Sequence, residues 1–250
     1  MSKNNLAVKE EMEEVVVEEA ILPNATAKNN VRVMYNEEMK TKKKIIYKII
    51  KRMIDIIGAL IGTVLLIPAT IIIYFARKFS KEEQGPLFYE QLRYGKNGKI
   101  FRLYKYRSMC IGADEKLKEY LANNEEARKE FKKTHKLQND PRITKIGNFL
   151  RKTSLDELPQ MINILKGDMS FVGPRPVVEK EVEEYGEKKE KFLSVKPGLT
   201  GYWQVNGRSN TTYEERMEME LYYVDNCSLW LDIKIFFKTF ITVFKKEGAV

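Results

Sequence analysis

Two adjacent carboxylates, Asp156 and Glu157, close the most densely patterned stretch of the chain, residues 140–160, in which cationic side chains come first. One carboxylate can attack phosphorus without a general base, and the other can hold Mg²⁺ against phosphate oxygens. On the residues alone, helix capping is the simpler explanation. Ser154 and Glu157 fit a capping box, and Asp156 fits a cap for a helix beginning just before Pro159.

Two arginines lie in turn-forming motifs further along the chain. Arg175 stands between Pro174 and Pro176, which fix the direction of the backbone, and a rigidly aimed guanidinium suits a phosphate group. Arg208 closes residues 196–208, which also contain aromatic side chains able to stack on a base or a sugar. A surface loop with an exposed arginine explains Pro-Arg-Pro just as simply, so this motif alone carries little weight.

The residue inventory excludes several kinds of site. His135 is the single histidine, which removes Ser-His-Asp and Cys-His nucleophile schemes. Cys110 and Cys227 are far apart and in no metal-binding spacing, so we expect neither a zinc site nor a disulfide. No P-loop or dinucleotide-binding glycine pattern is present. The net charge of +9 is compatible with binding to nucleic acid, to an anionic membrane surface or to a polyanionic small substrate. It does not distinguish among these three partners.

A membrane segment is the first element that must position these residues. An uncharged apolar run, residues 56–76, follows a lysine-rich stretch and ends at Arg77 and Lys78. At ~1.5 Å per residue it is long enough to cross a hydrocarbon core of about 30 Å, so a spanning helix is the simplest interpretation. Basic residues flank both ends, however, and Pro68 predicts a kink. We therefore favour a re-entrant membrane helix hairpin broken at Pro68, with both ends in the cytoplasm.

The remaining pattern predicts an α+β fold that is mostly α. Residues 1–40 predict a poorly ordered polar tail without a signal peptide, residues 41–80 the basic flank and re-entrant helix, and residues 81–250 a compact cytoplasmic catalytic domain. Residues 87–93 and 100–106 flank Asn-Gly turn chemistry and predict a small β-hairpin.

Helices are expected at four further places. Charged helices should cover residues 113–133 and 178–193, and Thr211 or Thr212 with Glu214 or Glu215 should form a capping box that opens a helix towards Val224. Residues 228–246 combine aromatic side chains with lysines. That segment is either an amphipathic helix in a membrane interface or a helix of the domain core, and the pattern leaves both open.

Eight blocks in this order resemble one family. They are residues 51–55, 101–109, 140–142, 154–160, 167–170, 173–176, 196–198 and 204–208. Over roughly four-fifths of its length the chain resembles the polyprenyl-phosphate hexose-1-phosphate transferases, which are bacterial sugar transferases also called monotopic phosphoglycosyl transferases.

The resemblance implies roles for individual residues. Asp156 would be the nucleophile, and Glu157 would hold Mg²⁺ together with Asp156. Four cationic residues would face phosphate or nucleotide: Lys105, Arg151, Arg175 and Arg208. The family's membrane helix is re-entrant and broken at a proline matching Pro68, although Ile67 stands here where a common form has serine.

The resemblance also implies a reaction. A hexose 1-phosphate would pass from a UDP-sugar to undecaprenyl phosphate through a covalent aspartyl-phosphosugar intermediate, giving UMP and undecaprenyl-diphosphate-sugar. This would be the first membrane step of exopolysaccharide, capsule or O-antigen synthesis, at the cytoplasmic face of the inner (plasma) membrane and without a nucleic-acid partner. The insert at residues 114–139 and the residues 228–232 look most like the branch that uses galactose. Galactose, glucose and N-acetylated sugars stay open, as do a homodimer and contacts with downstream glycosyltransferases.

Two competing interpretations remain. A non-catalytic, membrane-anchored interaction protein would use the basic surface to bind anionic lipid or nucleic acid, and would not depend on Asp156. The Asp156-Glu157 pair together with three arginine-bearing motifs disfavours it. The sequence does not exclude an enzyme that transfers the sugar phosphate directly within a ternary complex.

Overall fold

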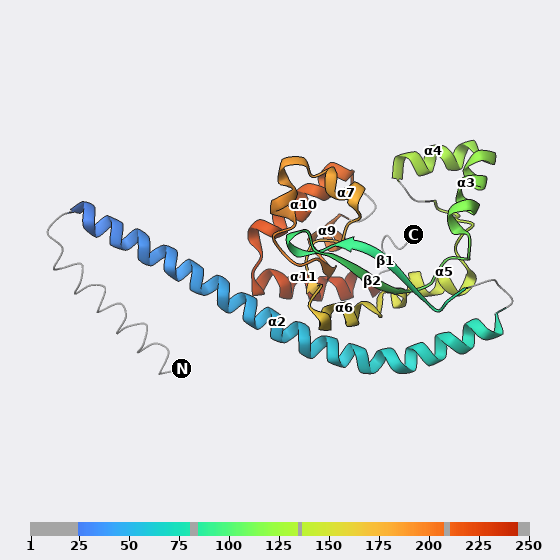
Figure 1. Cartoon of the computed structure of the whole chain (residues 1–250), viewed down its shortest axis with the longest axis horizontal. Coiled ribbons are helices and arrows are strands. Elements are labelled where there is room, and N and C mark those ends of the chain that lie inside the picture. The colour runs from blue at the N-terminus through green and yellow to red at the C-terminus, as the bar shows by residue number, and fades with distance from the viewer. Residues whose placement is uncertain (1–24, 81–84, 135–136, 208–210, 245–250) are drawn as a thin grey trace. The chain divides into compact units, whose positions relative to one another are not determined.

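A computed structural model describes residues 25–80, 85–134, 137–207 and 211–244 (Figure 1). The chain divides into two compact units, Met1–Lys51 and Arg52–Val250, and each is described by itself. The predicted division at residues 40 and 80 stays a prediction. The described elements are mostly helices with two small sheets, which confirms the α+β, mainly helical fold class.

The first unit is helical where the structure describes it. Helix α2 spans Ala25–Phe79, so residues 25–40, expected in a poorly ordered tail, lie in a helix. These sixteen residues contain neither proline nor glycine, and nothing in them interrupts a helical backbone. Residues 1–24 lie outside the described residues.

The apolar part of α2 continues through Pro68 to Phe79 as one helix. The predicted break at Pro68 is therefore not seen: a proline removes one backbone hydrogen bond, and here the helix accommodates it by the curvature visible in Figure 1. Among the described residues, Thr41–Phe79 is the one helical segment long and apolar enough to cross a membrane. The re-entrant hairpin stays a prediction for the chain in a bilayer.

One stripe of α2 packs against the rest of the second unit. Its buried residues recur at intervals of four and seven: Asp55, Ala59, Leu66, Ile73 and Arg77. Arg52 donates hydrogen bonds of 2.6 and 2.8 Å to the carbonyl oxygens of Ile164 and Leu165. One carboxylate oxygen of Asp55 accepts hydrogen bonds from the Ser170 hydroxyl and the Phe171 amide, both at 2.9 Å. Arg52 and Asp55 thus fix the helix to residues 164–171 of the same unit.

The predicted β-hairpin is confirmed. Strands β1 (Phe88–Tyr94) and β2 (Ile100–Tyr106) pair antiparallel, with Phe88 opposite Tyr106 and Tyr94 opposite Ile100. The turn contains η1 (Lys96–Gly98), where Asn97 and Gly98 have φ of 57° and 76°, as Asn-Gly turn chemistry predicts. A second, parallel sheet joins β3 (Ser170–Val172) to β4 (Gly198–Thr200) and was not expected from the sequence.

The two charged segments predicted as single helices are each divided. Residues 113–133 form α3 (Ala113–Asn123) and α4 (Glu125–Thr134), because Asn124 is extended and its side-chain oxygen accepts a hydrogen bond from the Ala127 amide. Residues 178–193 form α7 (Glu179–Glu183), η3 (Gly186–Lys188) and α8 (Lys189–Phe192). Gly186, with φ of 50°, interrupts that segment.

The remaining helices complete the second unit. They are α5 (Lys145–Lys152), α6 (Gln160–Lys166), α9 (Tyr202–Asn206), α10 (Tyr213–Asn226) and α11 (Leu229–Phe244). The capping box at the start of α10 is confirmed, with Thr212 and Glu215 exchanging hydrogen bonds. On α11, Trp230 and Phe237 are 65% and 63% exposed while Ile235 is buried, so the helix has one core face and one exposed aromatic face.

Candidate active site

The two adjacent carboxylates lie on a short turn between α5 and α6. This turn, η2, covers Leu155–Glu157 and follows Ser154, whose φ of 56° is in the left-handed region. Ser154 makes no side-chain cap hydrogen bond, so the predicted capping box with Glu157 does not form. A left-handed non-glycine residue costs on the order of 1 kcal/mol, and such strain gathers at functional sites. The turn therefore determines the direction of the two carboxylates, and its Ser154 side chain does not cap a helix.

Lys105 of strand β2 contacts both carboxylates. Its ammonium nitrogen lies 2.6 Å from a carboxylate oxygen of Glu157 and 4.0 Å from one of Asp156. Asp156 is buried, and the side chains of Lys105 and Glu157 are partly buried. The structure therefore brings together three residues that the family resemblance assigned to the site.

The two neighbouring acids differ in their proton affinity. Burial raises the pKa of Asp156 to about 6, with Lys105 opposing and the Glu157 charge adding to the rise. Burial also raises the pKa of Glu157, but the Lys105 ammonium and the Arg175 guanidinium outweigh it, so this pKa lies below its ordinary value. Acids with separated pKa values are typical of sites in which each has its own role. Asp156 is still mainly ionised at pH 7.

Arg151 reaches the same region from α5. Its guanidinium donates a 2.9 Å hydrogen bond to the Ser108 hydroxyl. Burial lowers the pKa of Arg151, and the negative charges of Asp156 and Asp140 oppose that change. Arg151 is thus a partly buried cation close enough to Asp156 to influence it electrostatically.

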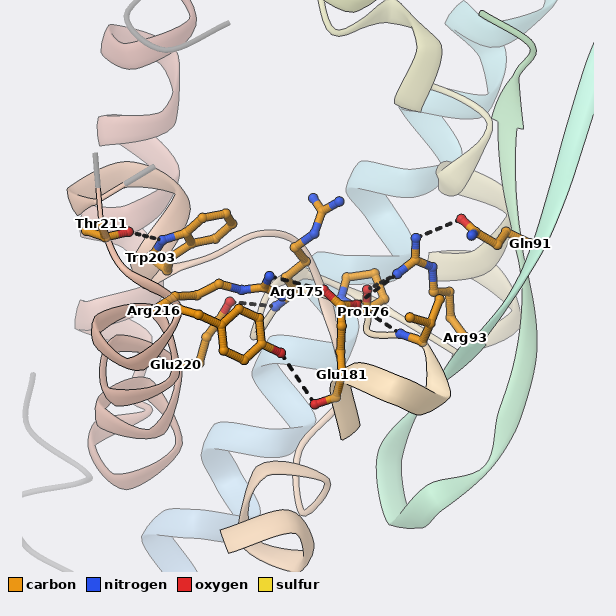
Figure 2. Close-up of polar contacts among 11 residues, drawn as sticks. Gln91, Arg93, Arg175, Pro176, Glu181, Trp203, Thr211, Arg216 and Glu220 are labelled. Carbon is orange, nitrogen blue, oxygen red and sulfur yellow. Dashed lines mark hydrogen bonds and ion pairs between the residues drawn. The ribbon is translucent and has the colours of Figure 1, made fainter. Parts of the chain in front are cut away.

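Arg175 lines a small pocket that is open to solvent. Polar side chains from five parts of the chain share this pocket: Arg93, Lys105, Glu157, Gln160, Arg175 and Gln204. In Figure 2 the Arg175 guanidinium points away from the polar contacts that are drawn around it. Burial, together with the positive charge of Arg175, lowers the pKa of Arg93 to about 10. An anion bound beside Arg93 and Arg175 would offset the repulsion between the two guanidinium groups.

Sequence reasoning missed Arg93 and a buried charged network behind the pocket. Glu181 of α7 lies 3.4 Å from Arg93 and 3.1 Å from Arg216 of α10. Arg216 also stacks against the Trp203 ring at 4.8 Å. No local sequence pattern marks these residues. Each lies on a strand or helix whose many charged residues predict a solvent-exposed face.

The aromatic pair expected to stack on a base or sugar already has partners within the protein. Trp203 donates a 2.9 Å hydrogen bond to the Thr211 hydroxyl besides its contact with Arg216. The Tyr202 ring lies 4.6 Å from that of Tyr222. Arg208 lies outside the described residues, and its predicted role stays a prediction.

The carboxylate pair fits a divalent cation only when a ligand supplies further oxygens. Among the described residues, no group of three or more His, Cys, Asp or Glu side chains is arranged to hold a metal ion. Mg²⁺ is commonly bound by one or two carboxylates together with substrate phosphates. Asp156 and Glu157 supply two carboxylates, and Lys105 contacts both of them.

Comparison with known proteins identifies similar chains. The family model described as bacterial sugar transferase matches residues 46–246. The undecaprenyl-phosphate galactose phosphotransferase of Salmonella typhimurium is 48% identical over 202 residues, covering 81% of this chain and 42% of that protein. The exopolysaccharide production protein ExoY of Rhizobium meliloti is 44% identical over 199 residues, covering 80% of this chain and 87% of that protein.

A relative named for glucose is also similar. The UDP-glucose:undecaprenyl-phosphate glucose-1-phosphate transferase of Escherichia coli is 41% identical over 206 residues, covering 79% of this chain and 40% of that protein. The chain therefore spans about two-fifths of the length of some relatives and nearly all of others.

Proposed function

Since the chain belongs to the bacterial sugar transferase family, we propose that it transfers a hexose 1-phosphate from a nucleotide diphosphate-sugar to a polyprenyl phosphate. The names of its relatives support undecaprenyl phosphate as acceptor and a UDP-sugar as donor. They include both galactose and glucose, so both sugars are candidates.

One observation carries the proposal: a buried carboxylate, Asp156, stands beside a second carboxylate and a lysine at a strained turn. In the first step an Asp156 oxygen forms a bond to the phosphorus next to the sugar, and the bond from that phosphorus to the nucleoside monophosphate breaks. In the second step an oxygen of the polyprenyl phosphate attacks the same phosphorus, and Asp156 leaves as a carboxylate. The products are UMP and the lipid diphosphate sugar.

The cations around Asp156 suit this chemistry. Lys105 and Arg151 lie beside the nucleophile, and Arg175 lies on the Glu157 side of the site. Fixed positive groups stabilise the charge on phosphoryl oxygens during transfer. When bound, Mg²⁺ would supply further charge stabilisation, with Asp156 and Glu157 as its protein ligands.

A covalent intermediate also suits the two substrates. The donor is water-soluble and the acceptor is a lipid, so a site that meets them one after the other avoids presenting both together. The apolar helix and the exposed aromatic face of α11 support membrane association. We place the enzyme as a monotopic protein at the cytoplasmic face of the inner membrane, with the Pro68 segment re-entrant and basic residues at both flanks.

Trapping the intermediate tests the mechanism. Purified protein is mixed with a UDP-sugar labelled in its β-phosphate, without lipid, and quenched rapidly. We expect one labelled peptide containing Asp156, UMP in equal amount, and no label on Asp156→Asn. Adding undecaprenyl phosphate should then move the label to lipid.

Other results would contradict the covalent mechanism or the proposed function. UMP release that begins only when lipid is added, with no labelled protein at any time, would establish direct displacement in a ternary complex. Transfer unaffected by Asp156→Asn would remove this residue from the reaction, and a lack of transfer with galactose, glucose and N-acetylated donors would contradict the proposed function.

A further inference from the structure

The Pro174–Pro176 loop is held by its backbone at three successive residues. Each residue is contacted from a different element: Gly198 of β4 donates to the Pro174 carbonyl at 2.8 Å, Arg175 donates its amide to Glu220 of α10 at 3.1 Å, and Arg93 of β1 donates to the Pro176 carbonyl at 3.1 Å. Two of these partners are side chains that lie far away in sequence. The direction of the loop is therefore set by the tertiary structure as well as by its prolines.

The contact made by Glu220 is distinct from the other two. Prolines have no amide hydrogen, so the Arg175 amide is the single backbone donor of residues 174–176. Its acceptor is a carboxylate with 0% exposed surface. Burying a carboxylate costs several kcal/mol unless it is well paired. The second oxygen of Glu220 accepts no hydrogen bond within the described part of the chain. Glu220 is thus costly as a core residue, and the hydrogen bond that its side chain makes among the described residues is to the loop.

A network of charged side chains also contacts the loop, at the Pro176 carbonyl. Arg216 donates to Glu181, and Glu181 contacts Arg93, which holds the Pro176 carbonyl. The Arg216 guanidinium lies against the rings of Trp203 and Tyr213 at 4.8 and 5.2 Å. Figure 2 shows Arg216 and Glu220 on one side of Arg175 and Arg93 on the other, with the Arg175 guanidinium extending away from them. The backbone of Arg175 is fixed, while its side chain is directed to the pocket that Glu157 and Lys105 also line.

From this arrangement we propose that Glu220 is the positioning residue for Arg175, and that it fixes the direction in which the guanidinium meets the phosphate or nucleotide of the donor. This inference rests on the proposed function, because it assigns the donor to the pocket lined by Arg175. Glu220 touches no substrate; it acts through the backbone amide of Arg175.

The first test measures the loop without using activity. Amide hydrogen exchange at Arg175 is compared between wild type, Glu220→Met and Glu220→Gln in the full-length protein in detergent. Methionine removes the acceptor, so exchange should accelerate at least tenfold; glutamine retains an acceptor oxygen, so exchange should stay near that of wild type. Glu218→Gln, an exposed glutamate of the same helix, is the matched control. Unchanged exchange in Glu220→Met would overturn the inference.

The second test measures coupling to the donor. The donor KM and kcat are determined for Glu220→Met, Arg175→Ala and the double variant. If Glu220 acts through Arg175, the single variants each raise the donor KM at least tenfold and the double variant is no worse than Arg175→Ala alone. Additive losses in the double variant would show an independent, structural effect and contradict the proposal.

The two hypotheses fail in different ways. A wild-type protein that transfers sugar phosphate, combined with unchanged exchange or additive losses, removes the role of Glu220 alone. A wild-type protein without transfer removes the proposed function. In that case the exchange experiment and calorimetric binding of UMP to the same variants decide the role of Glu220. Weaker UMP binding in Glu220→Met but not in Glu220→Gln would support it, and equal binding would contradict it.

Discussion

The ammonium group of Lys105 lies 2.6 Å from a carboxylate oxygen of Glu157, and this ion pair joins strand β2 to the turn that bears Asp156. Its side chains are 23% and 30% exposed, so water screens the pair only partly. The same lysine lies 4.0 Å from Asp156. One cation therefore favours the ionised form of both acids, and its removal should change the protonation of each.

The pH dependence of transfer should report this coupling. Because burial raises the pKa of Asp156 to about 6, kcat/KM for the donor should fall as pH decreases through about 6, where the nucleophile becomes protonated. Lys105 lowers that pKa, so Lys105→Met should move the fall to higher pH besides reducing the rate. The measurement is kcat/KM between pH 5 and 8, with the exposed Lys118→Met as control. An unchanged midpoint in Lys105→Met would contradict the coupling.

Glu157 should determine the metal requirement. If Glu157 is a ligand, Glu157→Gln should lower kcat or raise the Mg²⁺ concentration for half-maximal activity, on the order of 10- to 100-fold. Chelation should abolish turnover of wild type, and added Mg²⁺ should restore it. The exposed Glu119→Gln serves as the matched control. Full activity of wild type in excess chelator would remove the metal from the mechanism.

Arg175 and Arg208 should require the planar guanidinium. Lysine keeps the charge but loses the two parallel donors that match a phosphate, so Arg175→Lys and Arg208→Lys should each lose about 10-fold or more in kcat/KM. Both should unfold at the wild-type temperature. Arg102→Lys, at a 69% exposed side chain, should behave as wild type. Wild-type kinetics in both variants would show that neither guanidinium is needed for phosphate or nucleotide binding.

The membrane topology can be tested by accessibility. After Cys110 and Cys227 are replaced by serine, single cysteines are introduced at Asn36 and Gln84. If the helix is re-entrant, both should resist an impermeant thiol reagent in intact cells and react after lysis. Labelling of one position alone in intact cells would show an ordinary spanning helix.

Stability should vary with pH through Glu220. Burial raises the pKa of Glu220 to about 7, so the folded state binds a proton more tightly than the unfolded state does. The free energy of unfolding should therefore decrease as pH rises from about 4.5 to about 7, on the order of 1 kcal/mol per pH unit. The charged and titratable groups facing Glu220 are Arg175, Arg216, Glu181 and Tyr185.

Replacing the acid should remove this dependence. Glu220→Gln should be more stable than wild type at pH 8 and show a flatter profile between pH 5 and 8, measured by denaturant unfolding in detergent. Glu218→Gln should retain the wild-type profile. An equally steep decrease in Glu220→Gln would assign the pH dependence to another group.

Local patterns predicted some elements well and others not at all. The hairpin followed from Asn97 and Gly98, and the start of α10 followed from Thr212 and Glu215, because turn and cap chemistry act within a few residues. Asn124 divides a predicted helix since its side chain competes with the backbone, which the charge pattern does not reveal.

The site itself was recognised mainly through its resemblance to a family. Lys105, Asp156 and Glu157 come together as that resemblance implied. Residues Arg93 and Glu220 were missed because a buried charge on a charged strand or helix has no local signature. The hydrogen-bond partners of Arg93 and Glu220 lie more than forty residues away in sequence, and only the tertiary structure brings them into contact.

The glycines of α2 have a consequence for protein engineering. A Cβ atom added to Gly58 would lie 2.6 Å from the Phe171 ring, and one added to Gly62 would lie 2.6 Å from the Met161 sulfur. An apolar segment that serves only as an anchor can be exchanged for another of equal length and hydropathy. Here the segment is part of the enzyme's core, so a chimera with a foreign anchor should lose solubility in mild detergent unless it keeps small residues at these two positions.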